Sequence, residues 1–248
     1  MKMILSPSKT LSKTNTIEAH SEPIFSFEAQ LIRQELIGLN QKQIQTFYGV
    51  SDKLAHQVFH LIKSNTHRAA IDSYQGEAFK HLDAYTWNTT TAHKAQESLR
   101  ILSAMYGLLR PYDIINPYRL DFTVDFEALG LQPAYQFWSD KVTDAFQSQL
   151  VPNELVFNLA SKEFSSVLKK HRINQVGHWI DVDFLVEEDG KTKTISMVAK
   201  RARGLFARML LESHIETIED ITQIRTFDRF KLHLADSSTH YLKYIAKK

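Results

Sequence analysis

The segment from Ile44 to Val58 combines residue types that can hold a phosphate group. Helical apolar spacing lies on either side of the turn Gly49-Val50-Ser51. Gly49 allows the backbone conformation that a tight turn needs, and Ser51 can cap the helix that follows. The backbone N–H groups of such a turn and helix start point outward and form an anion site, to which Lys53 would add a charge-assisted contact.

This pattern predicts a helix-hairpin-helix over about residues 41–62, in which the turn and Lys53 contact the phosphates of double-stranded DNA. Such binding is independent of base sequence and weakens as the salt concentration rises. Ser51 stands where the motif usually has a second glycine, and Asp52 puts a negative charge beside the proposed phosphate. The same glycine, together with Ala55, would equally serve an ordinary helical hairpin whose only role is packing.

A second candidate anion site lies in the acid-free segment 196–211, which contains Lys200, Arg201, Arg203 and Arg208. A helix from Ala199 would place Lys200 and Arg203 three residues apart on one face, where two cations can bind one anion. Acidic runs precede and follow the segment, so the net charge of +2 conceals strongly basic and strongly acidic parts. The segment is predicted to bind phosphate or nucleic acid; a solvated helix face paired with neighbouring acids is the other interpretation.

Other short polar motifs favour a cleft without defining a reaction. Ser6-Pro7-Ser8-Lys9 has the Ser-x-x-Lys spacing of some nucleophiles, but its companion motifs are absent and the spacing recurs at 166–169. A polar turn directly after a strand can instead bind an anion through its N–H groups and Lys9. Arg119, Ser161 and Lys162 also lie in polar motifs, and we expect them to line the same anion-binding cleft as Lys9.

The sequence predicts no metal site and no cofactor. His56 and His60 have the i, i+4 spacing of a metal pair, but Gln57 stands where a zincin has glutamate and no third ligand is suitably spaced. The absence of cysteine excludes disulfides, thiolate metal sites and cysteine nucleophiles. Neither a Walker loop nor a Gly-x-Gly-x-x-Gly motif is present.

The elements that must position these residues follow from apolar periodicity. Helices are predicted over 25–39, 41–48, 52–62, 92–109, 135–150 and 199–213, the fourth ended by Pro111. The first of these helices is expected to bury Phe27, Leu31, Ile32 and Leu36. Strands are predicted over 3–5, 155–159, 180–186, 192–198, 230–234 and 241–245, the third and fourth joined at Asp189-Gly190.

Composition favours one soluble domain. Apolar residues make up 43% of the 248, which is enough for a sizeable core, and the 8 glycines and 6 prolines are too few for a linker-rich chain. With no repeat or linker, the simplest fold is a single α+β (mixed α/β) domain over residues 1–248. No apolar run reaches the roughly 18–20 residues of a membrane span, and the start of the chain does not resemble a signal peptide, so we expect a cytoplasmic protein.

Taken together, the motifs resemble the YaaA-type family of peroxide-stress resistance proteins. They occur in family order and cover nearly the whole chain: Ser6-Pro7-Ser8-Lys9-Thr10, Ser51-Asp52-Lys53-Leu54-Ala55, Leu102-Ser103-Ala104-Met105-Tyr106-Gly107-Leu108-Leu109-Arg110-Pro111, Pro117-Tyr118-Arg119-Leu120, Tyr135-Gln136-Phe137-Trp138, Asn158-Leu159-Ala160-Ser161-Lys162-Glu163-Phe164 and Lys200-Arg201-Ala202-Arg203-Gly204. The sequence departs from the family pattern at Ser8, where we expect alanine, and at Phe164, where we expect tyrosine. The stretch 74–79 replaces a Gly-Asp-x-Tyr pattern: it keeps the acid but loses the tyrosine hydroxyl of that pattern.

The resemblance implies a single mixed α/β domain with a helix-hairpin-helix and a basic cleft. It also implies DNA binding and a role in resisting hydrogen peroxide, by limiting free iron and protecting DNA. Carried over to this sequence, the implied cleft residues are Lys9, Lys53, Lys200, Arg201 and Arg203. A catalytic reaction and an oligomeric state do not follow from the motifs.

Two alternatives stay open from the sequence. One is an enzyme acting on a small anionic or phosphorylated substrate, with Lys9, Arg119, Lys200 and Arg203 as anion binders and Glu163 as an acid or base. A deep, closed cleft would favour it, whereas an open basic groove would favour DNA. The other is an iron-handling protein, which rests on the family role alone.

Overall fold

The first strand of the chain lies in the middle of a large, mostly parallel sheet. The computed structural model describes residues 1–12 and 16–248. Over these residues nine strands form one sheet in the order β4-β3-β1-β6-β7-β11-β10-β9, with β8 paired to β7. The strands of this sheet are β1 (Lys2–Leu5), β3 (Leu99–Ser103), β4 (Gly107–Leu109), β6 (Leu155–Asn158), β7 (His178–Glu188), β8 (Lys191–Lys193), β9 (Thr226–Phe227), β10 (Phe230–Leu232) and β11 (Tyr241–Lys247).

The five central strands are parallel and the outer ones are antiparallel. β1 pairs in parallel with β3 on one side and β6 on the other, and β6, β7 and β11 continue the parallel order. Met3, Ile4 and Leu5 are at most 1% exposed, as expected for a strand covered on both faces. The fold is therefore a mixed α/β single domain, and two short strands, β2 (Arg68–Ala69) and β5 (Ile114–Ile115), form a separate pair.

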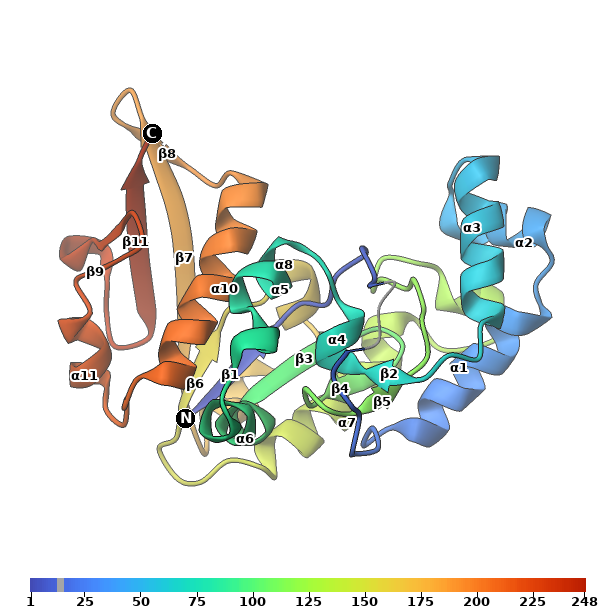
Figure 1. Ribbon diagram of the computed structural model, residues 1–248, viewed down its shortest axis with the longest axis horizontal. Helices are drawn as coiled ribbons and strands as arrows, with labels where there is room; N and C mark the ends of the chain where they lie inside the picture. The colour runs from blue at the N-terminus through green and yellow to red at the C-terminus, as the bar shows by residue number, and fades with distance from the viewer. Residues whose placement is uncertain (13–15) are drawn as a thin grey trace.

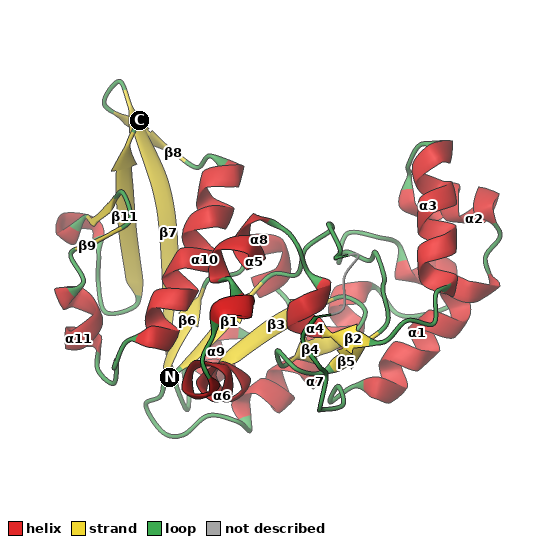
Figure 2. Cartoon of the chain, in the orientation of Figure 1, coloured by secondary structure: helices red, strands yellow, loops and turns green. Residues whose placement is uncertain are grey.

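Helices cover the sheet and extend one end of the molecule. Figure 1 shows α10 running beside β7 and α5, whereas α2 and α3 project at the end of the long axis opposite β9 and α11. Figure 2 shows the same division between the sheet and this helical end. The helices are α1 (Ser26–Gly38), α2 (Gln41–Tyr48), α3 (Asp52–Lys63), α4 (Ala70–Ser73), α5 (Glu77–Leu82), α6 (Thr89–Ser98), α7 (Ala134–Gln147), α8 (Lys162–Ser165), α9 (Lys170–Ile173), α10 (Ser196–Glu212) and α11 (Ile218–Gln223).

The helix predicted over 92–109 is wrong. The helical part, α6, ends at Ser98, and the rest of the apolar run forms β3 and β4. Every residue of these two strands is buried, so the run carries no periodicity that separates strand from helix. Gly107 has a φ of 67°, which favours glycine and ends any helical path through this segment.

Smaller corrections concern α1, β8 and α10. Ile32 and Leu36 are buried as predicted, but Phe27 is 69% and Leu31 38% exposed, so only part of the expected apolar face is covered. The return strand predicted over 192–198 is limited to β8, because α10 already begins at Ser196. The remaining predicted helices and strands are present, with bounds shifted by a few residues.

The C-terminal end of α10 is closed by a lysine from α6. Lys94 Nζ donates to the carbonyl oxygens of Leu210, at 3.0 Å, and Ser213, at 2.5 Å. The last carbonyls of a helix lack partners within the helix, and a cation there also opposes the negative end of the helix dipole. Burial lowers the pKa of this ammonium group.

Replacing Lys94 by methionine is therefore expected to lower the free energy of unfolding by about 1.5 kcal/mol, because two charge-assisted hydrogen bonds are lost. Urea unfolding measures the change, and amide hydrogen exchange should increase in the last turn of α10. Lys42→Met is the control, since Lys42 is an exposed residue of α2. Equal stability of the two variants would contradict a capping role for Lys94.

Candidate functional site

A cavity of about 720 Å³ opens where β1 and β6 end, in front of the first turns of α10. The chain leaves β1 into the segment 6–10 and leaves β6 into the segment that leads to α8. Ligands of open α/β sheets commonly bind at the carboxyl ends of parallel strands. The volume lies in the range of small-molecule sites, so this cavity is the principal candidate site.

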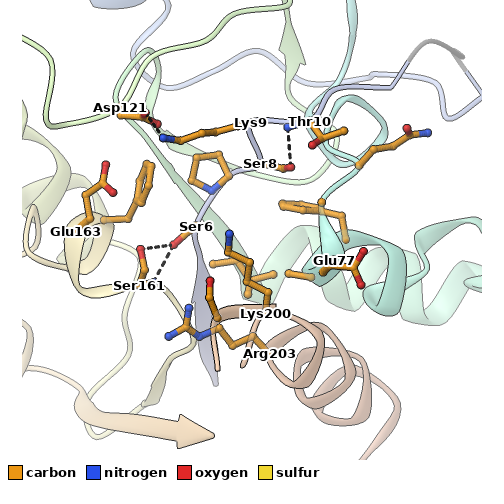
Figure 3. A pocket seen from close by; sticks show the side chains of 18 of the residues that line it. Ser6, Ser8, Lys9, Thr10, Glu77, Asp121, Ser161, Glu163, Lys200 and Arg203 are labelled. Carbon is orange, nitrogen blue, oxygen red and sulfur yellow. Dashed lines mark hydrogen bonds and ion pairs between the residues drawn. The ribbon is translucent and has the colours of Figure 1, made fainter. Parts of the chain in front are cut away.

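Two serines join the strand ends below this cavity (Figure 3). The backbone N–H of Ser161 donates to Ser6 Oγ at 2.8 Å, and Ser6 Oγ donates to Ser161 Oγ at 3.2 Å. Both serines line the cavity. These bonds connect segments 155 residues apart, so they fix the relative position of the two strand ends.

Lys200 and Arg203 approach the same cavity from α10. Both line it, as expected for cations three residues apart on one helix face. Arg203 Nε is buried, and within the described residues it has no hydrogen-bond partner. Burial lowers the pKa of the Arg203 guanidinium, and the charge of Asp183 partly opposes this. An unpaired guanidinium nitrogen at a cavity is a suitable donor to an anionic ligand.

Two carboxylates face the cavity from the opposite side in Figure 3. Asp121 Oδ2 lies 2.6 Å from Lys9 Nζ, so the predicted anion binder Lys9 is engaged in an ion pair. Glu163 Oε1 is buried and has no hydrogen-bond partner among the described residues. Burial raises the pKa of Glu163, and the charge of Asp121 raises it further, whereas Lys9 and a backbone N–H of Phe122 lower it.

The raised pKa of Glu163 gives a testable pH dependence. A carboxyl whose pKa is higher in the folded than in the unfolded chain holds its proton more tightly when folded. The free energy of unfolding therefore falls as the pH rises from the ordinary value of 4.5 through the folded-state pKa. Glu163→Gln should abolish this fall. We therefore expect the variant to be more stable than the wild type at pH values above the folded-state pKa, and the difference in the free energy of unfolding to shrink at lower pH.

Urea unfolding between about pH 4 and 8 measures this difference across the titration range of a perturbed carboxyl. Glu35→Gln is the matched control, because Glu35 is an exposed residue of α1. A Glu163→Gln profile that stays parallel to the wild-type profile at all pH values would show that burial does not perturb this carboxyl.

A buried hydroxyl network holds the segment that carries Arg119 and Asp121. The Tyr118 hydroxyl lies 2.6 Å from that of Tyr74 and 2.7 Å from Ser103 Oγ. Both tyrosines are buried, and burial is the largest cause of the raised pKa of each. Because Ser103 ends β3, the network connects this wall of the cavity to the sheet.

The predicted site residues fall into separate groups. Lys9, Arg119, Ser161, Lys200 and Arg203 line the cavity together. Two other predicted residues are not among its lining residues: Arg201 Nη2 pairs with Asp228 Oδ1 at 3.2 Å, and Lys162 is exposed at the start of α8. Gly49, Val50, Ser51 and Lys53 lie at the projecting α2–α3 end of the molecule.

The α2–α3 turn, residues Gly49–Ser51, has the local geometry that the sequence predicts. Gly49 has a φ of 58° and ends α2, and the Val50 N–H donates to the Gln45 carbonyl at 3.2 Å. Ser51 Oγ accepts from the Leu54 N–H at 3.4 Å, which caps α3. Lys53 is exposed in the first turn of α3.

Tyr48 is the last residue of α2. Its hydroxyl is buried, with no hydrogen-bond partner among the described residues. Burial raises its pKa, the charge of Asp121 raises it further, and that of Arg119 lowers it.

Asp121 is the main site residue that sequence reasoning missed. It follows Tyr118-Arg119-Leu120 directly, so its place two residues after a predicted anion binder was the available signal.

The i, i+4 histidine pair of α3 does form: His56 Nε2 and His60 Nε2 lie 3.1 Å apart. Over residues 1–12 and 16–248, no three or more His, Asp or Glu side chains are grouped to hold a metal ion. No helix in this part of the chain is both long and apolar enough to cross a bilayer.

Comparison with known proteins now defines the class. A family model described as peroxide stress protein YaaA matches residues 1–235. A UPF0246 protein of Marinomonas sp. is 37% identical over 232 residues, covering 89% of this chain and 88% of its own. UPF0246 proteins of Crocosphaera subtropica and Francisella philomiragia are each 33% identical, over 96% of this chain and 96% and 98% of theirs.

The chain therefore belongs to the peroxide stress protein YaaA family, also represented by these UPF0246 proteins. The resemblance found in the motifs is confirmed over almost the whole chain.

Proposed function

We propose that the protein is a sequence-independent DNA-binding protein of the cytoplasmic response to hydrogen peroxide. The family to which the chain belongs bears the name of peroxide stress, which supports the role in that response. The observation that carries the DNA-binding part is the α2–α3 turn, where a left-handed glycine and a serine cap present the start of α3 to solvent.

The turn and α3 supply what a phosphate contact needs. The first N–H groups of a helix have no partners within the helix, and the positive end of the helix dipole favours an anion there. Lys53 is exposed beside these groups, while Ala55 and Val58 face the core and hold the two helices together. We propose that this pair acts as a helix-hairpin-helix that contacts one phosphate group of a duplex.

Replacing Lys53 by glutamine is expected to weaken duplex binding at all sequences alike. Loss of one phosphate contact should lower the slope of log affinity against log salt concentration by about 1. Fluorescence anisotropy with a labelled duplex at several salt concentrations measures both effects. Lys42→Gln removes the same charge from α2 and should leave the slope unchanged; equal slopes for wild type and Lys53→Gln would remove the turn from the binding site.

Limitation of free iron by the protein is a further part of the proposal, and it rests on the family resemblance alone. Equilibrium dialysis of the purified protein against ferrous iron under anaerobic conditions tests direct sequestration. Retention of about one iron per chain would support it, and no retention would exclude sequestration as the means of lowering free iron.

The cavity supports a second candidate function, an enzyme that acts on a small anionic or phosphorylated substrate. Its volume of about 720 Å³ suits a small molecule. Glu163, with its buried unpaired oxygen and raised pKa, is placed to exchange a proton there. Peroxide survival of a deletion strain that carries either Glu163→Gln or Lys53→Gln separates the two candidate functions. Loss of protection in the Glu163→Gln strain, while the Glu163→Gln protein still binds the duplex normally, would favour the enzyme.

A further inference from the structure

We propose that the cavity binds a single nucleotide unit, with its phosphate at Lys200 and Arg203 and its base toward Glu163. The unit has two possible sources with the same chemistry: a free nucleoside monophosphate, or a nucleotide turned out of a strand held at the α2–α3 turn. The second source rests on the proposed DNA binding, and the first does not.

The charges of the cavity fit a phosphomonoester. Five cationic side chains and three carboxylates belong to its lining, which leaves two positive charges when all are ionised. Two of the cations already pair with acids, Lys9 with Asp121 at 2.6 Å and Lys80 with Glu77 at 3.3 Å. A phosphomonoester carries about −1.5 to −2 charges at pH 7, which matches the surplus.

We expect the phosphate to bind at the cations Lys200 and Arg203. Within the described residues neither Lys200 nor Arg203 forms an ion pair, and Arg203 Nε is buried without a partner. Ser6 and Ser161 lie close to these cations in Figure 3 and add hydroxyl groups on the same side. A buried donor without a partner costs free energy that a bound phosphate oxygen would recover.

The opposite end favours a group that donates hydrogen bonds. Glu163 Oε1 is a buried acceptor without a partner among the described residues, and Asp121 lies on the same side of the cavity. The amino and ring N–H groups of nucleobases are donors of this kind. A ligand that spans the cavity therefore carries an anion at one end and N–H donors at the other.

Much of the remaining lining of the cavity is apolar and partly aromatic. Leu5, Pro7, Phe79, Leu159 and Phe164 all line the cavity. Phe79 and Phe164 are each 6% exposed, and each packs on another aromatic ring, Phe79 on Tyr74 and Phe164 on Phe122. A planar base can rest against such a wall, whereas a sugar phosphate would leave it uncovered.

The free-nucleotide arm of the test uses isothermal titration calorimetry on the full chain. The four ribonucleoside 5′-monophosphates are compared with inorganic phosphate, ribose 5-phosphate and the nucleosides. We expect at least one monophosphate to bind saturably, at least about tenfold more tightly than any comparator, because both ends of the cavity must be filled. Failure of every monophosphate to bind, together with an unchanged emission in the strand experiment below, would overturn the proposal, as would equal affinity for ribose 5-phosphate.

Variants on α10 provide a matched comparison. Lys200→Met and Arg203→Met should each weaken the monophosphate about tenfold or more by removing a charge-assisted contact. Arg201→Met removes the same charge from the same helix, but Arg201 is paired with Asp228 and is not among the lining residues, so binding should be unchanged. Lys200 is exposed, so its variant keeps the test valid if Arg203→Met does not fold. Equal weakening by all three variants would indicate a general effect of charge and contradict a site.

The strand arm uses a duplex that carries one 2-aminopurine, whose emission rises when it leaves the base stack. If the emission rises with the wild-type protein but not with Lys200→Met, the bound nucleotide comes from the strand. An unchanged emission together with tight binding of a free monophosphate assigns it to the free pool. Lys53→Gln separates the two proposals: normal duplex binding by this variant overturns the role of the turn, while its binding of free monophosphate still reports on the cavity.

Discussion

Replacing Gly204 by alanine is expected to lower the free energy of unfolding by about 3 kcal/mol, the upper range for overpacking a tight contact. Elsewhere in a helix interior the same change would raise stability by about 0.5–1 kcal/mol, since glycine is a poor helix former. The sign reverses here because a Cβ on Gly204 would lie 2.0 Å from the carbonyl oxygen of Ala78 and 2.8 Å from its carbonyl carbon. Backbone atoms cannot rotate away, so α5 and α10 would have to separate.

Urea unfolding of Gly204→Ala measures the effect. Gly38→Ala is the control, because Gly38 is the last residue of α1 and no described atom beyond its chain neighbours and the backbone of its own helix lies within 4 Å of the added carbon. The separation of α5 from α10 would also widen the cavity, which both helices line. Stability of Gly204→Ala equal to that of Gly38→Ala would show that the two helices tolerate a larger spacing than the structure has.

Trp138→Ala should have the larger effect, a loss of about 4 kcal/mol, as is usual when a large aromatic side chain is removed from a core. The side chain is 0% exposed, and its Nε1 donates to the Ala104 carbonyl at 2.8 Å. It also fills the space left by Gly107, where a Cβ would lie 2.6 Å from the Trp138 ring. The substitution therefore removes the packing of α7 against the β3–β4 turn.

Trp138→Phe separates volume from hydrogen bonding. It keeps most of the ring and loses the bond to Ala104, so we expect a loss of about 1–2 kcal/mol, the effect of a single buried hydrogen bond with some lost packing. Thermal and urea unfolding of both variants provide the measurement. If Trp138→Phe were as unstable as Trp138→Ala, the hydrogen bond and not the packed volume would control this part of the core.

The α2–α3 turn and α10 could be predicted because their signals are local. Gly49 and Ser51 act on the backbone within a few residues of themselves, and the acid-free run from Ser196 concentrates charge in one helix. Predictions of this kind depend on neighbours in the chain. They placed Lys200 and Arg203 on one helix face, and both line the cavity.

The β3–β4 region and the acidic side of the cavity could not be predicted for the opposite reason. Leu99 and Leu102 are fully buried by strands and helices distant in sequence, so their apolar run has no exposed face to mark its period. Asp121 belongs to the site because Lys9, more than a hundred residues earlier, pairs with it. Such long-range contacts depend on the order of the strands in the sheet, and this order cannot be predicted from apolar periodicity.

The central place of β1 has a consequence for the order of folding. This strand is synthesised well before both of its neighbours, β3 and β6, which come much later in the chain. Its contacts therefore have high sequence separation, a topology that slows folding and leaves unpaired strand edges exposed meanwhile. On the ribosome the segment Lys2–Leu5 has no second partner until Leu155–Asn158 has emerged, so the cavity between their ends is assembled only after β6, and α10 completes its lining later still.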